Sequence, residues 1–279
     1  MSCVRLLQRN GVKRVIAVSD IHGWYRPLVE LFERVGIIER VDEDGGNTFK
    51  IGGDRLQYKG SETLIIIPGD FVDADAEGRK VLDLISNLER ETLRTGGELI
   101  ALLGNHERNL LQEDLRYWDQ IEEYYEWLES RPLVAIVNNV LFIHGGISKK
   151  AYHMIEESCR DDEDFVTCFT RSLEEDANIC WQVTNRTFAL QDEETLSKIM
   201  ESIRIEYMVI GHAPIYGKNR EEIKLVGPQI GGRMRVFNID ADMGDWHIEG
   251  EIIKKGGALS MCWMDDGLEI EYIYRNSQL

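Results

Sequence analysis

Short apolar runs alternate with longer amphipathic stretches along the first part of the chain. Three β-branched runs have the length of strands buried on both faces: residues 14–19, 63–68 and 98–103. Between them, apolar residues recur at helical spacing in 24–35 and 78–93, and two glycines at 96–97 end the second stretch. Residues 41–61 are rich in Gly, Asp and Lys and predict a hairpin or surface excursion. This alternation predicts parallel βα units and an α/β fold.

The second half of the chain changes to a helical stretch and then to closely spaced strands. Residues 133–143 predict two strands around a central turn, and 148–202 predicts an acidic helical insert. Five further runs predict strands: 206–210, 223–227, 233–239, 258–264 and 268–274. An Asp-Asp-Gly sequence at 265–267 predicts a hairpin turn between the last two. Parallel units followed by antiparallel strands predict two packed sheets flanked by helices, in a single domain over residues 1–279.

An acidic segment at 113–130 carries five aromatic residues: Tyr117, Trp118, Tyr124, Tyr125 and Trp127. Aromatic residues at helical spacing pack against a core more often than they line a ligand site. We therefore expect packing here, although this segment is also the feature that a partner-binding scaffold would use.

The formal net charge is −18, with 50 acidic against 32 basic residues. Such a field repels nucleic acid and anionic membranes, so neither is expected as a partner. It also opposes a phosphorylated substrate unless bound cations reverse the sign locally. The simplest reading of the acidic excess is a solvated surface.

Neither a membrane span nor a secretory signal is evident in the pattern of apolar residues. The N-terminal residues 1–14 include basic residues but no apolar segment of signal-peptide length. Five cysteines are scattered, without a CxxC pair, at positions 3, 159, 168, 180 and 262. This pattern argues against a zinc ribbon or disulfide scaffold and favours reduced thiols in the cytoplasm.

Residues able to bind a metal follow five of the predicted strands or apolar runs. They are Asp20 with His22, Asp70, Asn105 with His106, His144, and His212. Each motif alone is unspecific, but five compatible motifs in one chain predict convergence on a single site, because ligands bind beyond the carboxyl ends of strands in open sheets. The remaining histidines, His153 and His247, lie in polar contexts and are assigned to the surface.

The ligand types divide into two metal subsites that share one carboxylate. Asp20, His22 and Asp70 form the first set, and Asp70, Asn105, His144 and His212 form the second. Mixed oxygen and imidazole donors suit a first-row divalent cation better than calcium. Two such cations about 3.5–4 Å apart can activate a bridging water and clamp the oxygens of a displacement at phosphorus.

His106 adjoins Asn105 and can face the substrate if the asparagine faces the metals. We therefore expect His106 to act as a general acid that protonates the leaving oxygen. Asp73, three residues after Asp70, could hold His106 in its charged and oriented form.

The motifs SDIHG, GDFVD, GNHE, HGG and GHAP resemble, in order, the signature of the calcineurin-like metallophosphoesterase superfamily. The chain looks most like the phosphoprotein phosphatase branch and its prokaryotic relatives, including the symmetrical dinucleotide tetraphosphatases; the tail NIDADMG is also similar to those relatives. The resemblance implies a four-layer αββα sandwich of two mixed sheets and hydrolysis of phosphate esters by a hydroxide that bridges two divalent metals. Manganese is the expected metal, with iron, zinc, nickel or cobalt as alternatives. On that pattern the six ligands are those named above, and His106 with Asp73 forms the acid pair.

One departure from the family pattern concerns the substrate. The phosphatases usually continue the GDxVD motif with Arg-Gly, whose arginine grips the phosphate, but here Ala74, Asp75 and Ala76 follow Asp73. Arg108 or Arg186 are candidates to replace that arginine. We expect a phosphomonoesterase of protein-phosphatase type. The alternatives are a dinucleoside tetraphosphate hydrolase or phosphodiesterase, a nuclease, and a non-enzymatic interaction scaffold. The negative charge of the chain disfavours the nuclease.

Overall fold

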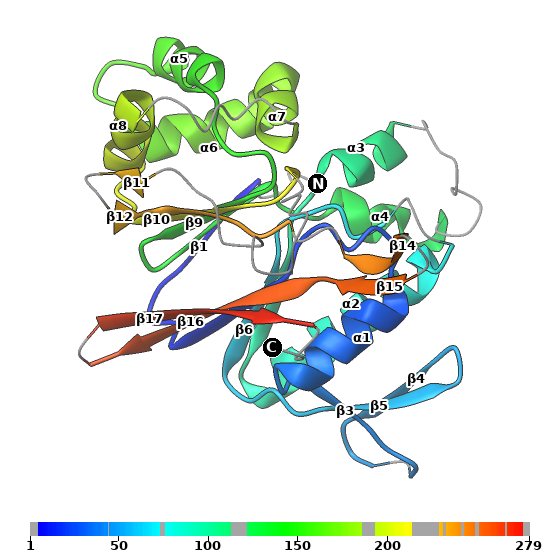
Figure 1. Cartoon of the computed structure of the whole chain (residues 1–279). Helices are drawn as coiled ribbons and strands as arrows, with labels where there is room; N and C mark the ends of the chain where they lie inside the picture. The colour runs from blue at the N-terminus through cyan, green and yellow to red at the C-terminus, as the bar shows by residue number, and fades with distance from the viewer. Residues whose placement is uncertain are drawn as a thin grey trace.

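Two five-stranded mixed sheets pack face to face at the centre of the molecule (Figure 1). The computed structural model describes residues 5–43, 45–72, 76–112, 122–185, 193–213, 229–230, 233–240, 243–248, 251–265 and 267–275. In the first sheet the strand order is β17 (Gly267–Tyr274), β16 (Gly257–Met264), β2 (Arg14–Ala17), β6 (Thr63–Ile67) and β7 (Glu98–Ala101). In the second it is β1 (Leu6–Arg9), β8 (Val134–Val137), β9 (Val140–Ile143), β10 (Tyr207–Ile210) and β13 (Val236–Asn238).

The strands are apolar on both faces because each sheet is covered on both sides. On β6, Leu64 and Ile66 point into the core between the sheets, whereas Ile65 and Ile67 point into the core beneath the helices. This alternation follows the two-residue period of a strand. Continuous apolar runs, rather than alternating ones, are therefore what this architecture requires.

Helices form the two outer layers, as Figure 1 shows. Helices α1 (Tyr25–Arg34) and α2 (Gly78–Thr95) pack on the first sheet, and α5 (Lys149–Ser158), α6 (Phe165–Glu175), α7 (Ala177–Thr184) and α8 (Glu193–Ile203) pack on the second. The predicted αββα order of layers is confirmed. The predicted elements at 14–19, 24–35, 63–68, 78–93, 98–103 and 133–143 are confirmed with small shifts of their ends.

Smaller elements join these layers. An antiparallel sheet of β3 (Ile38–Arg40), β5 (Asp54–Tyr58) and β4 (Thr48–Ile51) forms the predicted excursion. The other short elements are α3 (Asn105–Leu111), a 3-10 helix (Glu122–Tyr124), α4 (Tyr125–Glu129), and two hairpins, β11 (Gln229–Ile230) with β12 (Arg233–Met234) and β14 (Gly244–Ile248) with β15 (Glu251–Lys255). Tyr124 and Trp127 pack against the core beneath α1 and α2, as expected for this aromatic segment. The predicted strand at 223–227 and residues 113–121 lie outside the described residues.

The expectation of reduced thiols is wrong for two cysteines. Cys159, directly after α5, and Cys168, in α6, form a disulfide. Cys180 and Cys262 are free. Among the described residues, none of the helices combines the length and the apolar composition needed to cross a membrane.

The core between the sheets should carry much of the stability. Leu259 on β16 is fully buried there, whereas Leu93 on α2 is 67% exposed. We expect Leu259→Ala to lower the free energy of unfolding by about 2–5 kcal/mol, because it removes apolar contacts and leaves a cavity. The matched control Leu93→Ala should change it by less than about 0.5 kcal/mol. Equal midpoints in urea denaturation of the two variants would contradict this packing.

Candidate metal centre

The predicted ligands lie at the carboxyl ends of strands from both sheets. Asp20 and His22 follow β2, Asp70 follows β6, Asn105 and His106 begin α3 after β7, His144 follows β9, and His212 follows β10. The site therefore lies where the edges of two sheets meet, rather than at one sheet edge. Backbone hydrogen bonds join the loops: the Asp20 N–H donates to Gly69 at 3.2 Å and the His22 N–H to Asp70 at 2.9 Å.

Asp70 is the centre of this cluster, and its carboxylate is almost fully buried. Its Oδ2 lies 3.1 Å from His144 Nε2, 3.7 Å from His106 Nε2, 3.8 Å from His212 Nδ1 and 4.0 Å from His22 Nε2. Four imidazoles therefore surround one carboxylate. Burial alone would raise the pKa of Asp70, but the surrounding histidines, His144 above all, hold it well below its usual value.

The two remaining predicted ligands also reach this cluster. Asn105 Oδ1 lies 3.1 Å from His144 Nε2. Asp20 Oδ1 lies 4.0 Å from His22 Nε2, and its carboxylate accepts the His212 N–H at 3.0 and 3.1 Å. Burial, and next the nearby Asp240 carboxylate, raises the pKa of Asp20 well above its usual value.

The backbone at the cluster adopts a conformation that side chains with a Cβ disfavour. Four of the predicted ligands have positive φ angles: Asp20 (54°), His22 (50°), Asp70 (53°) and His212 (63°). Left-handed backbone at residues other than glycine costs about 1–3 kcal/mol each and persists only where the surroundings enforce it. The concentration of this strain at one place supports a functional role for these residues.

Side chains of the right type are close enough together to hold cations. Asp70, His144 and His212 form one such group, and His22, Asp70 and His106 form another, with the potential ligand atoms of each group within 4.8 Å of one another. His144 Nδ1 lies 2.8 Å from the Pro68 carbonyl, so it donates there and leaves Nε2 facing the cluster. Metal-binding histidines are commonly oriented by such a bond. The residues present therefore fit a centre with two cations that share Asp70.

The first subsite differs in one respect from the predicted ligand set. His106, expected to act as an acid, lies with His22 and Asp70, and its ring packs edge-on against His22 with centroids 4.7 Å apart. Asp20, expected as a ligand, is engaged with the His212 backbone. Asp20 and His106 are therefore both close enough to His22 to complete this subsite.

Glu107 is a residue of this site that the sequence analysis missed. It is fully buried, and its two carboxylate oxygens accept four backbone N–H groups: Asp70 (2.8 Å), Phe71 (2.9 Å), Val72 (3.2 Å) and Gly104 (2.9 Å). One side chain therefore connects the loop after β6 to the start of α3. Burial, and next Asp70, raises the pKa of Glu107 to about 7, while the N–H donors favour the ionised form. The only signal in the sequence was its place after His106.

Glycine at 104 is required by this close approach. A Cβ there would collide with the Asp70 carboxylate and backbone nitrogen. The GNHE motif therefore combines a residue without a side chain, a candidate ligand, a candidate acid and the buried anchor Glu107 in consecutive positions.

The candidate phosphate-binding residues are only partly described. Arg108 donates from Nη1 to Thr184 Oγ1 at 2.9 Å, which joins α3 to the end of α7. One turn earlier on α7, Trp181 is 48% exposed. Asp73 and Arg186 lie outside the described residues. His153 is exposed and near Glu156, in agreement with its assignment to the surface, and the side chain of His247 is not among those described.

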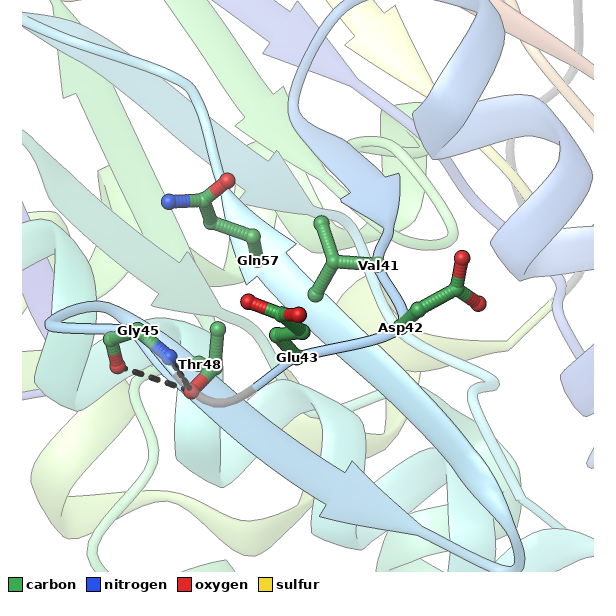
Figure 2. A pocket seen from close by; sticks show the side chains of 6 residues that line it. All are labelled: Val41, Asp42, Glu43, Gly45, Thr48 and Gln57. Atoms are coloured by element: carbon green, nitrogen blue, oxygen red, sulfur yellow. Dashed lines mark hydrogen bonds between the residues drawn. The ribbon is translucent and has the colours of Figure 1, made fainter.

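A hollow of about 460 Å³ occurs elsewhere, on the three-stranded sheet (Figure 2). Val41, Asp42, Glu43, Gly45, Thr48 and Gln57 line it. None of these residues belongs to the histidine–aspartate cluster, and the hollow is widely open. It is therefore separate from the candidate metal centre.

The Glu107 carboxylate can be tested by Glu107→Gln, which keeps the size of the side chain. Its amide NH₂ would face two backbone N–H groups, so we expect a loss of about 2–5 kcal/mol in the free energy of unfolding, measured on metal-free protein. The control is Glu91→Gln, because Glu91 is also buried but accepts from the Arg94 side chain on α2. A Glu107→Gln variant as stable as Glu91→Gln would show that these four contacts contribute little.

Comparisons with known proteins identify relatives among phosphatases. The chain is 29% identical over 119 residues to Shewanella-like protein phosphatase 2 of Arabidopsis thaliana, covering 42% of this chain and 27% of that protein. It is 23% identical over 235 residues to Shewanella-like protein phosphatase 1 of Plasmodium berghei, covering 71% and 60%. The chain thus spans three fifths or less of the length of these curated relatives.

A solved structure shows the same fold. The cold-active protein-tyrosine phosphatase of a psychrophilic Shewanella species matches with a TM-score of 0.60 and 21% identity, covering 97% of this chain and 84% of that one. The sequence profile described as calcineurin-like phosphoesterase matches residues 13–230, which include all six predicted ligands and His106. The chain therefore belongs to the calcineurin-like phosphoesterase family.

Proposed function

We propose that this chain is a metal-dependent phosphatase that hydrolyses phosphomonoesters, with phosphoproteins as the substrate class. The observation that carries the proposal is the convergence of four imidazoles on the buried Asp70 carboxylate. Membership of the calcineurin-like phosphoesterase family and the relatives named as protein phosphatases support it. We also propose that residues 1–279 act as one domain and work in the cytoplasm.

The ligand set of the proposal is Asp20, His22 and Asp70 for one cation, and Asp70, Asn105, His144 and His212 for the other. Bound there, two divalent cations would supply water activation and charge neutralisation at the phosphoryl group, and manganese is the metal we expect. The buried Asp70 carboxylate is placed to be shared, and His144 is oriented by Pro68. These groups hold their positions through the loops and Glu107 before any substrate binds.

Beyond the ligands, His106 is proposed to donate a proton to the leaving oxygen. Its side chain is one-quarter exposed, so substrate can reach it, and its backbone N–H is held by Asp70 Oδ1 at 3.0 Å. Asp73 is proposed to orient its ring. Arg108 is proposed to bind a phosphoryl oxygen through its Nε and Nη2 donors, because its hydrogen bond to Thr184 uses Nη1. Arg186 is the other candidate.

The substrate can be tested with protein first freed of metal by a chelator. We expect no hydrolysis without metal, and recovery on adding Mn²⁺, with phosphopeptides and p-nitrophenyl phosphate hydrolysed faster than bis(p-nitrophenyl) phosphate, cyclic nucleotides or a dinucleoside tetraphosphate. Preference for the tetraphosphate would support the dinucleotide hydrolase instead. If no compound is hydrolysed and elemental analysis finds no bound metal, the proposed enzymatic function is rejected and an interaction scaffold is favoured. Capture of a partner that depends on residues 113–130 would then test the scaffold.

The role of His106 can be tested by His106→Ala, with His153→Ala as a control at an exposed histidine outside the cluster. We expect His106→Ala to retain two metal ions per chain while kcat falls by about 10²–10⁴ on substrates with poor leaving groups, and less on p-nitrophenyl phosphate. The control should retain both activity and metal. Loss of one metal ion from His106→Ala would make it a ligand, in agreement with its place beside His22 and Asp70.

A further inference from the structure

The turn that carries His212 is strained and must be held by its neighbours. His212 has a φ of 63°, and the Ala213 N–H donates to the Gly211 carbonyl at 2.9 Å, which makes His212 the central residue of a three-residue turn. Three-residue turns with a positive φ at the centre are rare and strained. On one side the turn is fixed by Asp20, whose carboxylate accepts the His212 N–H.

The other side of this turn is held by a residue outside the five motifs. Asn238 ends β13, where it pairs in register with Ile210 of β10. Its Nδ2 donates to the Ala213 carbonyl at 2.6 Å, and its Oδ1 accepts the Asp240 N–H at 3.1 Å. Asn238 is buried, so water cannot readily replace these bonds.

The two bonds require an amide side chain. A carboxylate could accept from Asp240 but could not donate to Ala213, and a shorter hydroxyl could not span the two. Asn238 is the first residue of the NIDADMG tail and lies beyond residues 13–230, the region matched by the family profile. Its contacts in this chain, rather than that profile, indicate its role.

We propose that Asn238 is a positioning residue that holds the His212 turn, and through it the His212 imidazole, in place beside His144 for the second cation. His212 Nδ1 lies 3.1 Å from His144 Nε2, so a small rotation of the turn would separate the two nitrogens. Ligands held by groups behind them lose about 10–100-fold in metal affinity when that support is removed. The inference rests on the proposed metal centre.

The test is a titration of metal-free protein with MnCl₂ by calorimetry, on wild type, Asn238→Asp and Asn238→Ser. We expect both variants to bind one of two Mn²⁺ ions at least about tenfold more weakly than wild type. In Asn238→Asp the added carboxylate would by itself attract a cation, so weaker binding by this variant cannot be a charge effect. Asn238→Ser adds no charge and only shortens the side chain, which keeps the test available if the aspartate variant does not fold.

The matched control is Asn138→Asp. Asn138 makes the same pair of bonds to Val12, donating to its carbonyl at 2.9 Å and accepting its N–H at 3.3 Å, in the turn between β8 and β9. The Asn138→Asp substitution should lower the stability of the metal-free protein in urea, while both Mn²⁺ affinities stay at the wild-type value. Wild-type Mn²⁺ affinities in both Asn238 variants, or an equal loss in the control, would overturn the inference. A wild-type chain that binds no Mn²⁺ would instead reject the proposed metal centre.

Discussion

The candidate site depends on one buried carboxylate that is not itself a predicted ligand. Glu107 accepts four backbone N–H groups from the loop after β6 and from the start of α3. Buried backbone N–H groups that lack hydrogen-bond partners would destabilise the fold. The loop around Asp70 cannot pair its N–H groups in a regular helix or strand, because Asp70 has a positive φ angle. Glu107 thus allows the chain to adopt the conformation in which Asp70 faces the histidines.

The junction of two sheets explains how so many ligands can meet. Three strands of one sheet and two of the other end at the same place, so ligands reach Asp70 from both sheets: His22 and His106 from one, His144 and His212 from the other. A single sheet edge would spread five strand ends along a line, because neighbouring strands are about 4.8 Å apart. The two sheets approach so closely here that position 211 must be glycine, because a Cβ at Gly211 would collide with Asp20 and Ser19.

The sequence predicted the layers and the cluster because both follow from local patterns. Buried strands such as 63–68 are continuous apolar runs, and their ends are recognisable from the residue that follows. Features that depend on distant partners were not predictable in this way. Strand β1 exists because it pairs with β8, and the β14–β15 hairpin carries no strong turn signal. The disulfide joins the residue after α5 to α6, and no spacing rule predicts how these two helices pack. The roles of Glu107 and Asn238 depend on contacts with distant backbone groups, the Asp70 N–H 37 residues from Glu107 and the Ala213 carbonyl 25 residues from Asn238.

The chain and the proposed phosphate ester substrate are both negatively charged, and cations bound at the histidine–aspartate cluster would overcome this repulsion. A chain of net charge −18 repels a phosphate ester at long range. At the site, Asp20, Asp70 and Asp240 are all buried, and burying carboxylates is unfavourable unless positive charge accompanies them. Two divalent cations would offset the negative charge of these carboxylates where a phosphoryl group binds. The acidic surface would then restrict anion binding to the metal centre, because only there would the cations attract an anionic substrate.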